Sequence, residues 1–263
     1  MKLLVISDIH ANIWALDAVL NVENDFDLVC CAGDYTDYGI APIEVIDRMR
    51  TLSPAYLVYG NHDIHVLNTY RSGEWMNVKD GNYKWVHYNC EKLEGKSVSW
   101  LSSLPETLCF EVDGWQYCIQ HQFDNAYGVI ECRDSFERFW KEKTGCENCS
   151  GRRRVIFGHT HRQCIHILDE NMQWLNPGSV SYRRPDDSDK TAHYAVITDG
   201  EIMLRRIDYN RMPQFVEAKK YCRDERMMRT EIQDFMFFFG EAKTSRESLE
   251  YCEDYMPKVT RKE

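Results

Sequence analysis

The chain has 263 residues, 43% of them hydrophobic and 28% charged, and a formal net charge of -10. This length supports one substantial core, and the 13% aromatic content excludes a low-complexity disordered protein. An acidic surface repels nucleic-acid backbones and anionic membranes. We therefore expect neither a long nucleic acid nor a membrane as partner, although bound cations would reverse the sign locally.

The eleven cysteines are odd in number and include the adjacent Cys30 and Cys31. Cys118 lies in an apolar run. Such residues are typical of small buried side chains in a reducing compartment and not of a disulfide framework. The apolar start is too short for a signal peptide, and no later run would span a bilayer. We therefore expect a cytoplasmic protein.

Strands and helices alternate in the first 60 residues. Apolar runs at 3–6, 28–32 and 55–59 predict buried strands. A helical spacing of apolar residues follows Ile13, and Pro42 suits the first turn of a second helix. This order predicts a parallel or mixed sheet covered by helices.

Residues 63–115 are predicted to be mainly helical. Strands are expected again at 115–120 and 154–157, followed by hairpin-like segments at 163–167, 172–175, 193–198 and 201–207. We expect residues 1–210 to form one domain. Residues 211–263 are expected to be a helical C-terminal extension packed on it through 235–239. The same aromatic face would equally cover a partner, so the oligomeric state stays open.

Five polar segments each follow a predicted strand. Because loops beyond the carboxyl ends of strands share one crevice, they are expected to converge. Carboxylates, imidazoles and an amide oxygen suit Mn, Fe, Zn or Co better than calcium or a thiolate zinc site. Each segment alone is more often a surface turn, but five of the nine histidines lie in these segments. The segments are Asp8-Ile9-His10, Gly33-Asp34, Gly60-Asn61-His62-Asp63, His121 and Gly158-His159-Thr160-His161.

Spacing within the segments suggests roles. Asp8 and His10 lie two residues apart, as do His159 and His161, so each pair would point the same way if the backbone were extended. Asp34 stands alone after a glycine and suits a carboxylate that bridges two ions.

This series, followed by Asn-Pro-Gly-Ser at 176–179, resembles the calcineurin-like metallophosphoesterase superfamily over roughly the first 210 residues. The sequences at 34–39 and 100–105 resemble its compact bacterial phosphodiesterase branch, some members of which cleave diadenosine polyphosphates. The resemblance implies an α/β fold in which two mixed β-sheets pack as a sandwich flanked by helices, in four layers. Residues 1–210 would be the metallophosphoesterase domain.

The resemblance also implies two divalent metal ions. His62 would stand beside the leaving group as a catalytic residue, with Asp63 as its orienting partner. The first ion would be held by Asp8, His10, Asp34 and His161, and the second by Asp34, Asn61, His121 and His159.

Three positions depart from the family pattern. Ala11 replaces the usual glycine, which is mild if the backbone there is ordinary. Gln122-Phe123 replaces a glycine-serine pair, so substrate contacts would differ there. Tyr38 stands where protein Ser/Thr phosphatases carry a phosphate-binding arginine, which argues against a protein phosphatase.

We expect hydrolysis of a small phosphodiester or phosphoanhydride, such as a dinucleoside polyphosphate. A hydroxide bridging the two ions would attack phosphorus, and His62 would protonate the leaving oxygen. A phosphomonoesterase or a nuclease would use the same site. A non-catalytic scaffold is disfavoured because every expected ligand position is filled.

Other candidates carry weaker signals. Cys146 and Cys149 are half of a zinc site, and a reduced polar loop is the preferred interpretation. Arg152–Arg154 would contact a polyphosphate or, by preference, form a solvated loop. Side chains expected to be structural or core packing, the aromatic ones in preference to a nucleobase pocket, are His65, His87, His166, His193, Trp85, Phe136, Phe139 and Trp140.

Overall fold

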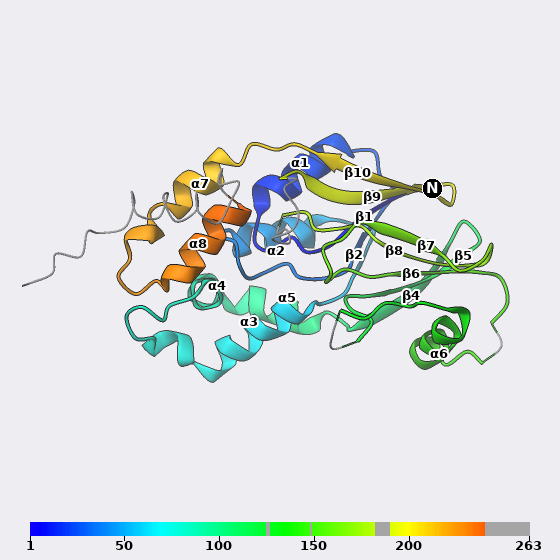
Figure 1. The fold of residues 1–263 in the computed structure, drawn as a ribbon, viewed down its shortest axis with the longest axis horizontal. Coiled ribbons are helices and arrows are strands. Elements are labelled where there is room, and N and C mark those ends of the chain that lie inside the picture. Colours follow the sequence, from blue (N-terminus) through cyan, green and yellow to red (C-terminus); the bar gives the residue numbers. More distant parts are fainter. Residues whose placement is uncertain (125–126, 148, 182–189, 240–263) are drawn as a thin grey trace, which may run out of the picture.

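Two five-stranded sheets form the centre of the computed structural model, which describes residues 1–124, 127–147, 149–181 and 190–239 (Figure 1). In the first sheet three strands run parallel and two pair antiparallel at one side. The order is β10 (Glu201–Ile207), β9 (Ala192–Thr198), β1 (Lys2–Ile6), β2 (Leu28–Cys31) and β3 (Ala55–Leu57).

The second sheet is also mixed. Its three central strands are parallel, and each outer strand is antiparallel to its neighbour. The order is β4 (Thr107–Val112), β5 (Trp115–Gln120), β6 (Arg152–Ile156), β8 (Met172–Asn176) and β7 (Cys164–Ile167).

The other regular elements of the described residues are helical. The longer ones are α1 (Ile13–Val22), α2 (Pro42–Thr51), α3 (Asn61–Ser72), α4 (Trp85–Lys92), α5 (Gly95–Ser103), α6 (Arg133–Thr144), α7 (Met212–Ala218) and α8 (Arg229–Phe238). Two short 3₁₀ turns, η1 (Glu74–Asn77) and η2 (Tyr221–Arg223), complete the set. Among the residues described, no helix is long and apolar enough to cross a membrane.

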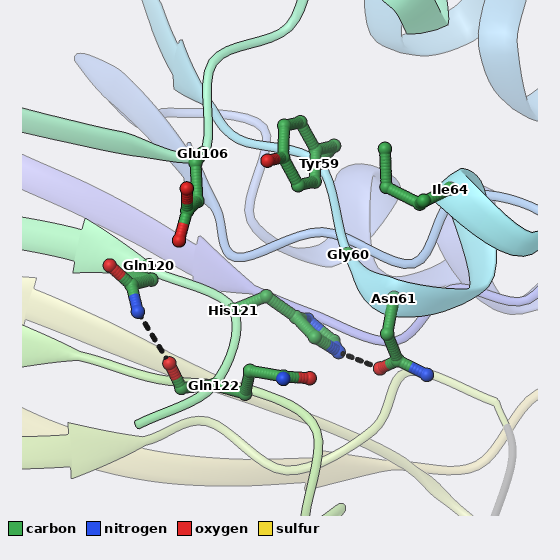
Figure 2. A pocket seen from close by; sticks show the side chains of 8 residues that line it. All are labelled: Tyr59, Gly60, Asn61, Ile64, Glu106, Gln120, His121 and Gln122. Atoms are coloured by element: carbon green, nitrogen blue, oxygen red, sulfur yellow. Dashed lines mark hydrogen bonds between the residues drawn. The ribbon is translucent and has the colours of Figure 1, made fainter. Parts of the chain in front are cut away.

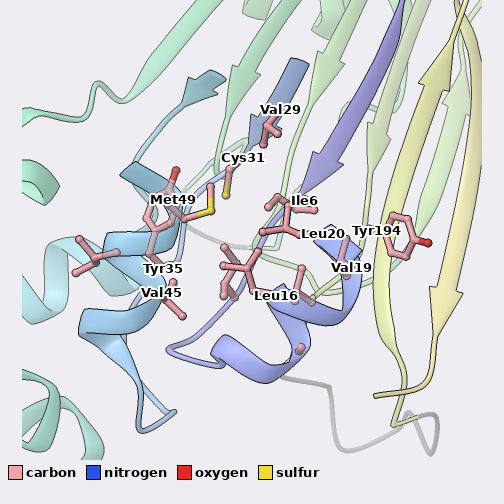
Figure 3. Packing of buried hydrophobic residues seen from close by; sticks show 14 of the residues in the cluster. Ile6, Leu16, Val19, Leu20, Val29, Cys31, Tyr35, Val45, Met49 and Tyr194 are labelled. Atoms are coloured by element: carbon pink, nitrogen blue, oxygen red, sulfur yellow. The ribbon is translucent and has the colours of Figure 1, made fainter. Parts of the chain in front are cut away.

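Alternation along β1 separates the two main cores. Leu3 and Val5 pack between the sheets against Tyr117 and Ile119 of β5. The intervening residues of β1 face the other way, onto α1 and α2, in the cluster drawn in Figure 3. A strand with both faces covered needs the uninterrupted apolar sequence that β1 has.

Helix α6 covers the outer face of the second sheet. Phe136, Phe139 and Trp140 are buried against Val155 and Trp174 of that sheet. Helix, sheet, sheet and helix therefore form four layers, and the predicted α/β class with two mixed sheets is confirmed. The three aromatic residues of α6 are core residues, as predicted.

Residues 63–115 are mainly helical, as predicted, but they end in a strand, β4, that the sequence did not indicate. Leu108 and Phe110 pack toward the inter-sheet core, whereas Cys109 and Glu111 are exposed. This period of two is the strand pattern, and pairing with β5 satisfies its backbone.

The arginine run at 152–154 is part of β6, so the predicted solvated loop is wrong. Arg153 is buried and donates two hydrogen bonds of 2.6 Å to Glu137. Arg154 is also buried, 3.9 Å from the centre of the Trp115 ring, and donates to the Tyr117 hydroxyl. Both guanidinium groups therefore interact within the fold, because each is buried next to a polar partner.

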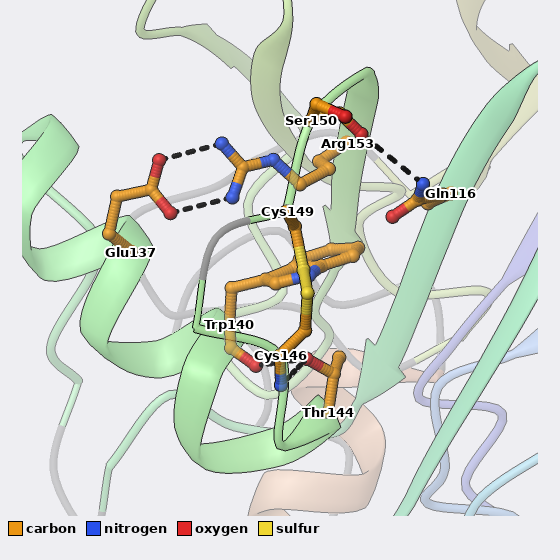
Figure 4. The surroundings of a disulfide bond; sticks show 8 residues. All are labelled: Gln116, Glu137, Trp140, Thr144, Cys146, Cys149, Ser150 and Arg153. Atoms are coloured by element: carbon orange, nitrogen blue, oxygen red, sulfur yellow. Dashed lines mark hydrogen bonds and ion pairs between the residues drawn. A yellow bond between two sulfur atoms is a disulfide. The ribbon is translucent and has the colours of Figure 1, made fainter.

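Cys146 and Cys149 form a disulfide, which corrects the prediction of a reduced loop or half of a zinc site (Figure 4). The chain turns at Gly145, which has φ 71°, after α6. The turn leaves the two Cα atoms 5.8 Å apart, a separation usual for disulfides. The cysteines predicted to be small buried residues, Cys30, Cys31 and Cys118, are buried and free.

Helices α7 and α8 lie beside α4 at one end of the molecule (Figure 1). Phe235 and Phe239 are buried with Trp85, whose indole N–H donates to the Glu231 carbonyl over 2.9 Å. The helical docking face around 235–239 is therefore seen. Residues 240–263 lie outside the described part, and the domain division after residue 210 stays a prediction.

Glu23 generates a stability prediction. Its buried carboxylate accepts hydrogen bonds from Tyr194 Oη and Arg205 and lies 2.8 Å from Lys2 Nζ. Glu23→Ala leaves these groups without their acceptor, and we expect a loss of about 2 kcal/mol in the free energy of unfolding. Urea denaturation at pH 7 measures it.

The exposed Asp25, which also contacts Lys2, provides the matched control, and Asp25→Ala should cost far less than Glu23→Ala because solvent screens its ion pair. Burial tends to raise the pKa of Glu23, but Lys2, Tyr194 and Arg205 lower it below 4.5. Its contribution is therefore complete above pH 4.5 and is lost as pH falls through the folded-state pKa. Equal losses in the two variants would contradict this assignment.

Candidate active site

The five predicted segments converge at the carboxyl ends of the parallel strands. Backbone hydrogen bonds join the loop after β1 to the loop after β2, from Asp8 N to Gly33 O (3.0 Å) and from His10 N to Asp34 O (2.9 Å). In the second sheet, Gly158 N donates to His121 O over 2.9 Å. The loops that carry the polar residues are therefore part of the same framework as the sheets.

Asp8, His10 and His161 form one half of the site. Nε2 of His161 lies 3.0 Å from Asp8 Oδ1 and 3.4 Å from Nε2 of His10. Nε2 of His10 is 3.9 Å from Asp34 Oδ2, and Asp34 lies between this half and the other half. All three side chains would reach one cation, since a set of their ligand atoms lies within 4.8 Å of one another.

Asn61, His121 and His159 form the other half. Asn61 Oδ1 lies 2.9 Å from Nε2 of His121 and 2.9 Å from Nδ1 of His159. Nε2 of His121 is also 3.1 Å from Asp34 Oδ2. The structure thus brings all seven predicted metal-ligand side chains into one cluster, with Asp34 between the halves.

Asp34 is anchored through one oxygen only. Its Oδ1 accepts a hydrogen bond of 2.8 Å from the backbone N–H of His62. Its Oδ2 is buried, and although Nε2 of His121 is 3.1 Å away, no donor among the described residues is oriented to hydrogen-bond to it. A buried carboxylate oxygen without a donor is costly, and a bound cation would satisfy it.

Hydrogen bonds also set the histidine tautomers. Nδ1 of His121 lies 2.6 Å from the Ala32 carbonyl, and Nδ1 of His10 lies 3.2 Å from the Thr36 carbonyl. Each Nδ1 must therefore carry the proton, which leaves the lone pair of a neutral ring on Nε2, facing the site. Lone pairs of nitrogen and oxygen meet there, an arrangement that fits divalent cations with mixed N/O ligands.

Charges within the site shift several pKa values. Burial lowers the pKa of His10 to about 3, so this ring is neutral. Burial would also lower the pKa of His121, but the Asp34 carboxylate outweighs it and raises the pKa to about 9. Burial would raise the pKa of Asp8 and Asp34, yet the imidazoles of His161 and His121 hold both below the usual range. Both carboxylates are therefore ionised and available as ligands.

The loops that carry these residues are not extended. Five of the seven predicted ligands have positive φ between 47° and 66°: Asp8, His10, Asp34, His159 and His161. The left-handed conformation costs roughly 1 kcal/mol for each such residue, so the cluster stores backbone strain. The extended backbone that would point each pair the same way is therefore absent, and Ala11, with φ 51°, does not have an ordinary backbone either.

Asp37, and not Asp63, is the partner of His62. Asp37 Oδ2 lies 2.8 Å from Nδ1 of His62, and Asn89 of α4 accepts from the Asp37 backbone N–H over 3.0 Å. Burial would lower the pKa of His62, but Asp34 and Asp37 raise it to about 9. The sequence contained Asp37 in the 34–39 motif, three residues after Asp34, but gave no distance to His62.

Asp63 instead connects α3 to the loop after β2. Its two carboxylate oxygens accept from the backbone N–H groups of Gly60, Asp34, Tyr35 and Thr36, at 2.9 to 3.1 Å. Adjacent helix residues point in different directions, which explains why Asp63 cannot face the His62 ring. The prediction that Asp63 orients His62 is wrong, and its role is to position Asp34.

Two further side chains reach the site. Nδ1 of His65, predicted to be structural, lies 3.5 Å from Asp37 Oδ2 and is 56% exposed, so it borders the site. The Tyr127 ring stacks on His159 with centroids 4.9 Å apart, a contact that no sequence signal indicated. The other histidines are structural, as His166 stacks on Trp174 and His87 accepts from the Lys84 backbone.

A cavity of about 300 Å³ opens directly beside Asn61 and His121 (Figure 2). Its remaining wall consists of Tyr59, Gly60, Ile64, Glu106, Gln120 and Gln122. The cavity thus borders the half of the site that Asn61 and His121 form.

Comparison with known proteins agrees with this geometry. An uncharacterized protein of Methanocaldococcus jannaschii is 27% identical and is matched over 82% of this chain and 96% of its own length. A symmetrical bis(5'-nucleosyl)-tetraphosphatase of Yersinia pestis is 36% identical over 74 residues, 27% of this chain and 26% of that protein. The crystal structure of a metallophosphoesterase from Sphaerobacter thermophilus shares the fold, with a TM-score of 0.61, 21% identity and coverage of 84% and 94%.

The model of the calcineurin-like phosphoesterase superfamily domain matches residues 1–199, which include all seven clustered side chains and His62. This range exceeds half of the chain and ends with the antiparallel strand β9. The chain therefore belongs to the calcineurin-like phosphoesterase superfamily and is a phosphoric ester hydrolase.

Proposed function

We propose that the protein hydrolyses a small phosphodiester or phosphoanhydride of the dinucleoside polyphosphate kind, with the help of two divalent metal ions. The observation that carries the proposal is the position of Asp34 Oδ2, buried without a hydrogen bond between the imidazoles of His10 and His121. An oxygen in this position suits a ligand shared by two neighbouring ions.

The substrate class is supported by chemistry and by similarity. The bis(5'-nucleosyl)-tetraphosphatase that matches part of this chain has a name that specifies a dinucleoside polyphosphate substrate. Tyr38 in place of a phosphate-binding arginine, and the cavity beside Asn61, favour a substrate with an organic group over a phosphoprotein. We assign the first ion to Asp8, His10, Asp34 and His161, and the second to Asp34, Asn61, His121 and His159.

When bound, two divalent ions supply positive charge for the phosphoryl oxygens and an activated water. The protein residues orient these partners. Asp63 holds the loop of Asp34 through backbone hydrogen bonds, and Asn61 lies at the first turn of α3, whose positive end faces the site.

His62 is positioned to protonate the leaving oxygen. Its Nδ1 is held by Asp37 over 2.8 Å, so the opposite ring nitrogen is the one available to substrate. Its ring centroid lies 5.1 Å from that of His10, at the edge of the ligand cluster, and its side chain is 20% exposed. A histidine held in this way acts as a general acid without being a metal ligand.

A substrate panel tests the function. Protein loaded with Mn²⁺ should hydrolyse bis-p-nitrophenyl phosphate and a dinucleoside tetraphosphate faster than p-nitrophenyl phosphate or single-stranded DNA, because the cavity beside Asn61 offers room for the second organic group of a small diester or anhydride. Chelator-treated protein is the control. A preference for the monoester would identify a phosphomonoesterase, rapid DNA cleavage a nuclease, and no hydrolysis with any first-row ion would leave a scaffold.

Asp34→Asn tests the bridging position. The amide keeps the shape but removes the negative charge and one oxygen, so we expect the bound metal to fall from about two ions per chain to one or none. Metal analysis after equilibrium dialysis measures this without an activity assay. Asp37→Asn, which changes a carboxylate outside the ligand set, is the matched control, and two ions retained by Asp34→Asn would contradict the assignment.

His62→Ala tests proton donation. The variant should lose roughly 100-fold in kcat for an alkyl phosphodiester, whose leaving oxygen needs a proton, and much less for bis-p-nitrophenyl phosphate. Asp37→Asn should show the same dependence on the leaving group to a smaller extent, since it removes only the orienting partner. Equal losses for both leaving groups would exclude His62 as the general acid.

A further inference from the structure

The cavity beside Asn61 and His121 is also lined by a carboxylate, that of Glu106 (Figure 2). Its volume of about 300 Å³ reaches the lower end of the range for small-molecule pockets. One side is formed by metal-ligand candidates, so a group bound there would be attached to the phosphate under attack. The opposite side presents the Glu106 carboxylate, which is 59% exposed and accessible to a ligand.

The negative charge of Glu106 selects against a second phosphate in this cavity and favours a group that donates hydrogen bonds. Lys143 Nζ lies 3.8 Å from this carboxylate and does not line the cavity. The neighbouring amide does not offer an alternative, because Gln120 Oε1 accepts from Thr107 and its Nε2 donates to the Gln122 carbonyl, each over 2.6 Å. Glu106 is thus the acceptor that a ligand would meet.

Shape adds a second constraint. The Tyr59 ring and the Ile64 side chain face the cavity from the same side, and Gly60 between them adds no side chain (Figure 2). An aromatic and an aliphatic surface beside a polar end suit a flat ring with a polar edge. Burial and the adjacent Glu106 carboxylate raise the pKa of Tyr59, so its hydroxyl stays protonated.

We propose that this cavity binds the guanine base of a nucleotide substrate, with the Glu106 carboxylate accepting from the two adjacent N–H groups on the Watson–Crick edge. Guanine is the natural base whose edge presents two neighbouring donors, N1–H and N2–H, to the two oxygens of one carboxylate. Adenine presents one donor and one acceptor there, and its acceptor would face the negative charge. The inference rests on the proposed function, because the cavity opens onto the proposed metal ligands.

One wall residue lies at a departure from the family pattern. Gln122 lines the cavity at the position where the bacterial phosphodiesterase branch carries glycine. A glycine would remove that part of the wall, so a pocket of this form depends on the departure from the family pattern. The residues that select the base are therefore separate from those that hold metal.

Binding of free nucleosides tests the proposal without catalysis. Guanosine and adenosine, which have no phosphate, are titrated into the full chain without added metal, and binding is followed by saturation-transfer NMR. Guanosine should bind roughly tenfold more tightly than adenosine. Glu106→Gln should remove or reverse the preference, because an amide offers one donor and one acceptor and so matches adenine.

Glu111→Gln is the matched control, because Glu111 is exposed on β4, the strand that begins one residue after Glu106, and does not line the cavity. It should leave the preference unchanged. Equal binding of the two nucleosides by the wild-type protein, or a guanosine preference that survives Glu106→Gln, would overturn the proposal.

A second measurement separates this inference from the proposed function. The ratio of kcat/KM for bis(guanosine) over bis(adenosine) tetraphosphate should exceed roughly 10 for the wild-type protein and fall toward one for Glu106→Gln. Wild-type hydrolysis of bis-p-nitrophenyl phosphate together with a ratio near one would refute the base pocket alone. Absence of all hydrolysis would refute the proposed function, and the nucleoside titration would still decide the pocket.

Discussion

The site depends on lone pairs that face one another. The Ala32 and Thr36 carbonyls accept hydrogen bonds from the Nδ1–H groups of His121 and His10, so the Nε2 lone pairs point toward the Asp34 carboxylate. Without a cation, such a cluster is relieved only by protonation, and the raised pKa of His121 has that cause. A divalent ion replaces the proton as the positive charge. The backbone carbonyls that hold the two histidine rings thus contribute to what the site binds.

Strain and support are concentrated in the same loops. Left-handed conformations at five of the clustered residues would relax in an isolated loop, and the surrounding framework prevents this. Asp63 contributes most to that framework at Asp34, through backbone N–H groups on both the β2 loop and α3. Gly60 is needed there as well, since a Cβ at this position would lie 2.0 Å from Asp34 Oδ1. The framework thus holds the strained loops around the cluster.

The sequence predicts the strands that carry the site because each polar segment follows an apolar run, and the four-layer fold follows from the resemblance. It does not predict Asp37 as the partner of His62, since the two are 25 residues apart and only the fold makes them neighbours. The prediction of a solvated loop at Arg153 and Arg154 is wrong for a related reason. A charged run indicates solvent unless partners such as Glu137 and Tyr117 are already known to be near. Long-range pairing of polar groups is therefore what sequence patterns omit.

In this protein, the residues of the metal-ligand cluster and the residues of the opposite cavity wall lie on different structural elements. The loops beyond the parallel strands are fixed by both sheets, so the ligand cluster tolerates little variation. The wall opposite the cluster comes from the residue before β4 and the residue after His121, neither of which is part of a hydrophobic core. Under the proposed base pocket, replacing Glu106 or Gln122 would change the substrate without changing the metal ligands. Selectivity is therefore to be sought in these wall residues and not in the motifs that identify the family.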